Sequence, residues 1–70
     1  MNLYILNEVL ADYTAGMAVI AAESKDAARV IWIEEFGDYH ASDFDKHAKF
    51  TVIEGVNHAP GMVSYCWGGG

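Results

Sequence analysis

The chain has 70 residues, a formal net charge of −6 and a hydrophobic fraction of 53%. This length allows one small hydrophobic core, and the hydrophobic fraction is too high for an intrinsically disordered protein. Ten acidic residues against four basic ones make nucleic-acid backbones and anionic membranes poor partners, and favour a basic protein surface.

The chain carries one cysteine, which excludes an internal disulfide and a four-cysteine zinc site. A reducing compartment fits best. The first residues include no basic leader and no long apolar run, so we expect no signal peptide, no membrane span and a cytoplasmic location. We expect one domain over residues 1–70.

Two apolar segments open the chain. Residues 3–10 are rich in Leu, Tyr, Ile and Val, and their apolar character on both faces predicts a strand in the centre of a sheet. Residues 11–16 form a polar break, and residues 17–22 have the length and composition of a second strand. The two strands are predicted to pair as a hairpin.

A helix is predicted over residues 25–36. Ser24 precedes it as an N-cap, and Asp26 favours the positive end of the helix dipole. Gly37 supplies the positive φ that commonly closes a helix, and a polar stretch over residues 38–47 follows.

The helix is expected to place one stripe of residues against the sheet, consisting of Ala27, Ala28, Ile31 and Trp32. Three apolar residues fall outside this stripe, namely Val30, Ile33 and Phe36. One interpretation leaves Val30 and Ile33 exposed singly and folds Phe36 under the next loop. The other gives the three residues a contact with a partner or with a second copy of the chain.

Two further strands are predicted over residues 48–56 and 62–67. The turn cluster at residues 57–61 indicates that they form a second hairpin. The fold class is therefore α+β, with a four-stranded antiparallel sheet in the order strand-strand-helix-strand-strand and one helix packed on one face. Residues 68–70 are expected to form a flexible glycine tail.

Half of the acidic residues lie in one tract without a basic residue among them: Glu34, Glu35, Asp38, Asp43 and Asp45. Carboxylates spread over a helix end and a loop can imitate the spacing of backbone phosphates on a basic partner. The alternative is a solvated face that keeps the protein soluble. The residues predicted to bind the partner are these five acids together with Ile33 and Phe36.

Catalytic and metal sites are not expected. Four potential metal ligands fall close together, but their spacing matches neither a zinc motif nor an EF-hand loop: His40, Asp43, Asp45 and His47. Cys66 and His58 are expected at opposite ends of one strand, and Cys66 is expected to pack as a small hydrophobe. We therefore predict no catalytic residue, no cofactor and no enzyme activity.

Three segments resemble small uncharacterised proteins of phages and mobile elements: MNLYIL at 1–6, VIAAESKDAAR at 19–29 and GMVSYCWGGG at 61–70. The middle segment is also similar to small type I anti-CRISPR proteins. This resemblance implies an inhibitor that works in the host bacterial cytoplasm and covers a nucleic-acid-binding surface of a defence complex. The implied partner is a CRISPR effector complex. A homodimer is a separate expectation, which rests on Val30, Ile33 and Phe36.

The alternative function comes from a second resemblance, to ubiquitin-like sulfur carriers. The chain is similar to them in length, acidity, strand-strand-helix-strand order and its Gly69-Gly70 ending. The resemblance implies that the terminal diglycine enters the narrow channel of an adenylating enzyme. The chain departs from these carriers at Cys66-Trp67-Gly68, where they usually have aliphatic residues.

Overall fold

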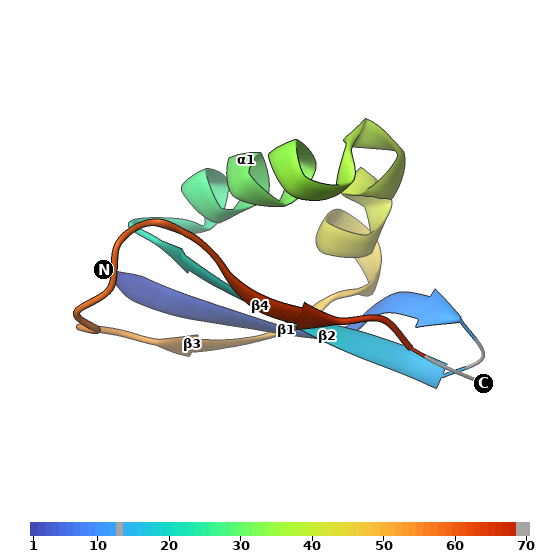
Figure 1. Cartoon of the computed structure of the whole chain (residues 1–70), viewed down its shortest axis with the longest axis horizontal. Coiled ribbons are helices and arrows are strands. Elements are labelled where there is room, and N and C mark those ends of the chain that lie inside the picture. Colours follow the sequence, from blue (N-terminus) through green and yellow to red (C-terminus); the bar gives the residue numbers. More distant parts are fainter. Residues whose placement is uncertain (13, 69–70) are drawn as a thin grey trace.

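The computed structural model describes residues 1–12 and 14–68, which form a four-stranded antiparallel sheet with one main helix on one face (Figure 1). The predicted α+β class is confirmed. The strands and the helix have these bounds: β1 (Asn2–Asp12), β2 (Thr14–Ala22), α1 (Lys25–Phe36), β3 (Lys49–Ile53) and β4 (Gly61–Cys66). Two short helical turns connect α1 to β3: η1 (Asp38–His40), a 3₁₀ turn, and η2 (Asp43–His47), a π turn.

The strand order in the sheet is β3-β1-β2-β4, and all neighbours are antiparallel. β3 therefore pairs with β1 and β4 pairs with β2, so the predicted hairpin between the last two strands is wrong. Their connection crosses the end of the sheet, where the Val56 N–H donates to the Met1 carbonyl at 2.9 Å. The physical reason is that the long β1–β2 hairpin has two edges with unpaired backbone groups, and each edge takes one short strand.

The predicted helix is confirmed with its bounds. Ser24 accepts a hydrogen bond from the Ala27 N–H at 3.1 Å, which makes it the N-cap. Gly37 has a φ of 87°, and its N–H donates to the Ile33 carbonyl at 2.7 Å. Both ends of α1 therefore follow from local sequence chemistry.

The core lies between α1 and the sheet. Tyr4 and Leu6 on β1 stand opposite Ile20 and Ala18 on β2, and all four are buried on the face that α1 covers. Ala28 and Trp32 are the buried residues of α1, as the predicted stripe requires. The other two stripe residues, together with Ile33 and Phe36, are partly buried against this core. Phe36 therefore packs inward beside the loop after α1, as the first interpretation expects, whereas Ile33, which that interpretation leaves at the surface, also packs against the core.

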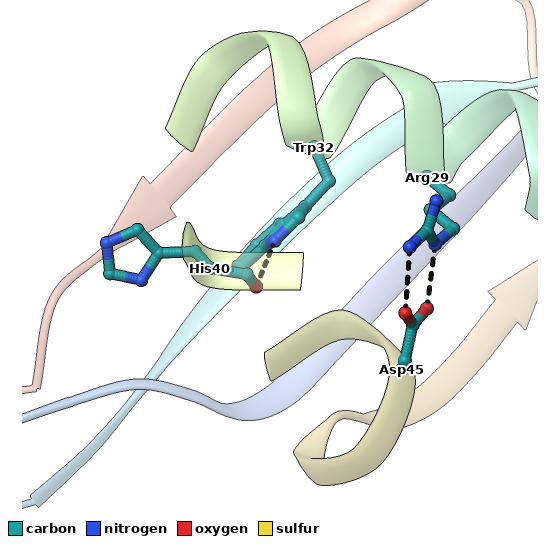
Figure 2. A network of polar contacts seen from close by, with 4 residues as sticks. All are labelled: Arg29, Trp32, His40 and Asp45. Atoms are coloured by element: carbon teal, nitrogen blue, oxygen red, sulfur yellow. Dashed lines mark hydrogen bonds and ion pairs between the residues drawn. The ribbon is translucent and has the colours of Figure 1, made fainter. Parts of the chain in front are cut away.

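Trp32 is fully buried, and its indole Nε1–H donates to the His40 carbonyl at 2.9 Å (Figure 2). Its ring lies 4.5 Å from that of Phe36 and 6.1 Å from that of Phe44, measured between centroids. Phe44 is buried in η2 and also contacts Phe50 on β3. Trp32 therefore fastens the segment after α1 to the core.

β1 is irregular in its second half. Its register with β2 shifts after Asn7 and again after Val9, and two residues adopt positive φ, Glu8 at 62° and Leu10 at 52°. Val9 and Leu10 are consecutive in the chain and both are buried, which a regular strand with one covered face does not permit. These bulges bend the strand and bring both side chains to the core.

The end of the described chain crosses the β1–β2 hairpin. Gly68, expected to belong to a flexible tail, is buried, and its N–H donates to the Leu10 carbonyl at 2.9 Å. A methyl group on Gly68 would overlap the Thr14 carbonyl, and one on Gly16 would overlap the Cys66 carbonyl. This crossing therefore requires glycine on both sides. Gly69 and Gly70 lie outside the described residues.

Candidate functional site

The five acids of the predicted tract fall into two groups. Asp43 and Asp45 in η2 bond to other parts of the fold. Glu34, Glu35 and Asp38 are exposed and form no ion pair or side-chain hydrogen bond within residues 1–12 and 14–68. The acids that are free to meet a partner are therefore those around the C-terminal end of α1.

Asp45 joins η2 to α1. Arg29 donates to its two carboxylate oxygens at 2.8 and 2.9 Å, a bidentate pair (Figure 2). The hydrogen bond from Arg29 stabilises the carboxylate, which lowers the pKa of Asp45 and raises that of Arg29. Both side chains are exposed, so salt screens this pair, and its main effect is to fix the position of η2.

Asp43 bonds to the irregular part of β1. Its Oδ2 accepts the Leu10 N–H at 3.2 Å, and His40 Nδ1 lies 3.9 Å from the same oxygen. Leu10 has positive φ, so its N–H points away from the regular strand ladder and needs another acceptor. Asp43 therefore satisfies a backbone donor of β1, so it belongs neither to a purely solvated face nor to the acids that are free to meet a partner.

We predict that Asp43→Ala destabilises the fold by about 1–3 kcal/mol, because it leaves the Leu10 N–H without an acceptor. Asp43→Asn keeps an acceptor oxygen and should lose less. Asp38→Ala removes a carboxylate of the same chemistry from an exposed position, so it should change the free energy of unfolding by less than about 0.5 kcal/mol. Urea unfolding followed by circular dichroism measures all three. Equal midpoints for the two alanine variants would contradict the assigned role of Asp43.

Glu34 and Glu35 lie in the last turn of α1, which has no basic residue. The C-terminal end of a helix carries partial negative charge, so each carboxylate there is unfavourable by about 0.3–1 kcal/mol. Asp38 follows at the start of η1. Glu34 and Glu35 thus occupy an end of the helix where they oppose stability, and a third acid follows directly after it.

An open hollow of about 420 Å³ lies between α1 and the start of β4. Ile31, Pro60 and Met62 give it apolar walls, and Glu34 and Glu35 also line it. Such a hollow suits a lysine or arginine side chain, because the aliphatic stem can lie on the apolar residues while the charged head reaches the carboxylates.

Exposed aromatic side chains lie beside this end of the helix. The Phe36 ring contacts Tyr65 at 5.0 Å and Trp67 at 5.9 Å, and the His40 ring contacts Tyr39 at 5.3 Å and Trp67 at 5.6 Å. Tyr39 is 91% exposed and Trp67 is 48% exposed. We call the following residues the acidic–aromatic surface: Glu34, Glu35, Asp38, Tyr39, Tyr65 and Trp67.

Sequence reasoning identified the acids of this surface and missed its aromatic component. Tyr39, Tyr65 and Trp67 are not among the residues that the sequence predicts to bind a partner. The available signal was the position of Tyr39 next to Asp38 in a polar stretch, where an aromatic ring has little chance of burial. The contact between Phe36 and Tyr65 depends on the order of the strands in the sheet, and no local sequence pattern predicts it.

The residues considered for metal binding and catalysis do not come together in one site within the described ranges. Asp45 is bonded to Arg29, and no group of three or more His, Cys, Asp or Glu in the described ranges is arranged to hold a metal ion. Cys66 is exposed, so the prediction that it packs as a hydrophobe is wrong. The His58 ring lies in the connection before β4, with Nδ1 2.6 Å from the Ala59 carbonyl oxygen.

No family model, curated protein or solved structure matches the chain. The resemblances to phage proteins and to sulfur carriers remain predictions. In the part of the chain that the structure describes, every helix is too short or too polar to cross a membrane.

Proposed function

We propose that the chain is a non-catalytic acidic binding protein that uses its acidic–aromatic surface to engage a basic surface of another protein. The observation that carries this proposal is the placement of Glu34 and Glu35 at the negative end of α1 without a compensating cation in its last turn. Because the fold loses stability there, binding is the better explanation for both acids.

The neighbouring features suit a lysine- or arginine-rich partner. The hollow between α1 and β4 accepts a long basic side chain, and the faces of Tyr39 and Trp67 attract cations. Tryptophan and tyrosine are also enriched among the residues that dominate binding energy in protein interfaces. The acids supply fast association, and the aromatic rings supply contact area.

We further propose that the partner surface is one that binds nucleic acid in a bacterial defence complex, as the resemblance of residues 19–29 to anti-CRISPR proteins implies. Carboxylates of this kind compete with phosphates for the same cations. The net charge of −6 repels nucleic acid itself, so the protein acts on the partner rather than on its substrate. No observation favours the sulfur-carrier alternative, because Gly68, directly before the diglycine, is buried and bonded to Leu10.

We predict that the double variant Glu34→Lys/Glu35→Lys loses inhibition of target-DNA binding by a purified type I CRISPR effector complex. Its affinity for the complex should fall at least about tenfold, since charge reversal places two cations against a basic surface. Its unfolding free energy should be unchanged or higher, because lysine favours a helix C-terminus. Native gel shifts and binding measured at increasing salt provide the readouts.

The matched control is Glu23→Lys/Glu54→Lys, which makes the same change in net charge at two other exposed positions. This control should inhibit almost as well as the parent protein. If both double variants weaken binding equally, net charge acts alone and the site assignment fails. If the parent protein leaves DNA binding unchanged, the effector complex is not the partner.

A further inference from the structure

The sheet has a second face that no helix covers. Figure 1 shows α1 and the two short turns on the same side of the sheet. Alternation along the paired strands places apolar side chains on the other side, and we call this the open face: Leu3, Ile5, Met17, Val19, Ile53 and Cys66. An antiparallel sheet that meets water on one face usually has polar residues there, so these side chains break the expected alternation.

In a chain of net charge −6, no carboxylate occurs among the residues that the paired register of strand positions 2–7, 17–22, 49–53 and 61–66 places on the open face. Its other members in the strand register are small or uncharged, such as Asn7, Thr51 and Ser64. At its margin Lys49 pairs with Glu8 at 2.9 Å, so both charges are compensated. A strongly basic partner would find no carboxylate on this face, and a nucleic acid would find only Lys49, which Glu8 already compensates. A second copy of the chain can approach the face without local charge repulsion.

The size of the face fits the same occupant. The whole chain extends 34 Å in its longest direction, which runs along the strands, and 17 Å in its shortest, so a contact over this entire side would have a footprint of at most about 600 Å². A standard interface buries about 800 Å² on each partner. Two open faces in contact would therefore form an interface no larger than the lower end of the range for specific complexes.

We infer that two copies of the chain pack their open faces together into a homodimer with the layer order helix, sheet, sheet, helix. In a two-fold dimer each copy uses the same patch, and apolar sheets stack face to face about 10 Å apart. Ile5 and Val19 face each other across the two central strands, so they lie at the centre of the contact. Most of the acidic–aromatic surface lies on the helix side of each copy, whereas Trp67 lies at the border and lines a hollow together with Met17 and Cys66 of the open face. The inference rests on no acid of that surface, so it stands independently of the proposed function.

Sedimentation equilibrium over about 5 to 500 µM tests the dimer. We expect the wild-type protein to dimerise, and Ile5→Lys and Val19→Lys each to weaken the dimer at least about tenfold. Val30→Lys adds the same charge to the outer surface of α1, where Val30 is 56% exposed, and should leave the dimer intact. A wild-type monomer throughout this range overturns the inference and leaves the open face to a different protein. If Val30→Lys is the only variant that loses the dimer, the inference is wrong and the interface involves the outer surface of α1.

Cys66 gives a second measurement on the unaltered protein, which keeps the test valid if a lysine variant fails to fold. It is the only cysteine, it is exposed, and it pairs with Met17 on the open face. The second-order rate constant for reaction of the Cys66 thiol with a soluble maleimide should fall at least about threefold as dilute protein is concentrated past the dimer midpoint. If this rate constant does not depend on protein concentration although sedimentation shows a dimer, the interface lies elsewhere.

Discussion

Trp32→Ala is expected to destabilise the protein by about 3–5 kcal/mol, the largest loss we expect from a single side chain. Trp32 is fully buried and contacts the rings of Phe36 and Phe44. A domain of this size has a total stability of only about 4–10 kcal/mol, so the variant should be largely unfolded in mild denaturant. Its loss would also release η1, because the indole N–H holds the His40 carbonyl.

Trp32→Phe separates the contribution of ring packing from that of the hydrogen bond to His40. It keeps most of the ring volume and removes the donor to His40, so we expect a loss of about 1–3 kcal/mol. Val30→Ala shortens an exposed side chain on the same helix and should change stability by less than about 0.5 kcal/mol. Far-UV circular dichroism in urea follows all three variants without relying on tryptophan fluorescence. A Trp32→Ala midpoint equal to that of the parent would falsify the core assignment.

Gly68→Ala is the second large effect, with an expected loss of about 3 kcal/mol. The added methyl would overlap the Thr14 carbonyl, and backbone cannot yield as the end of a flexible side chain can. The chain would have to move away from β2, and the hydrogen bond from Gly68 to Leu10 would stretch or break. Leu10 would then lose its carbonyl partner at a position where its backbone already adopts positive φ.

Gly16→Ala should cost a similar amount, because its methyl would overlap the Cys66 carbonyl at the same crossing. The two losses should not add, since the first substitution already separates the segments that the second would push apart. Ala59→Ser adds one atom to an exposed residue of the connection before β4 and serves as the control. Additive losses in the double variant would show that the two glycines act at separate contacts.

Local chemistry allowed α1 to be predicted with its bounds. Ser24 and Gly37 determine its ends through short-range hydrogen bonds and backbone geometry, and both signals are readable in the sequence. The four strands were likewise found by composition. The partners of β3 and β4 were not predicted. β3 and β4 are separated by a turn cluster typical of a hairpin, but each pairs with an edge of the β1–β2 hairpin that is distant in the sequence.

The bulged part of β1 had no sequence signal. Glu8 and Leu10 adopt positive φ, a conformation that residues other than Gly, Asn and Asp rarely adopt. Tertiary contacts impose this conformation. The role of Asp43 follows from this, since its partner at Leu10 lies 33 residues away in the chain. Sequence reasoning therefore identified the acidic tract correctly as a charge feature but could not separate the structural acids from Glu34 and Glu35.

The strand order β3-β1-β2-β4 has a consequence for the order of folding. Only the β1–β2 pair is local in sequence, so it has the lowest loop-closure cost, whereas β3 and β4 must return over long stretches of chain. Tyr65 on β4 reaches Phe36 only when the last strand has joined the sheet. A chain still emerging from the ribosome, or one truncated before β4, would therefore display its acids and Tyr39 without Tyr65 and Trp67, and the binding that we propose for this surface would require β4 in place.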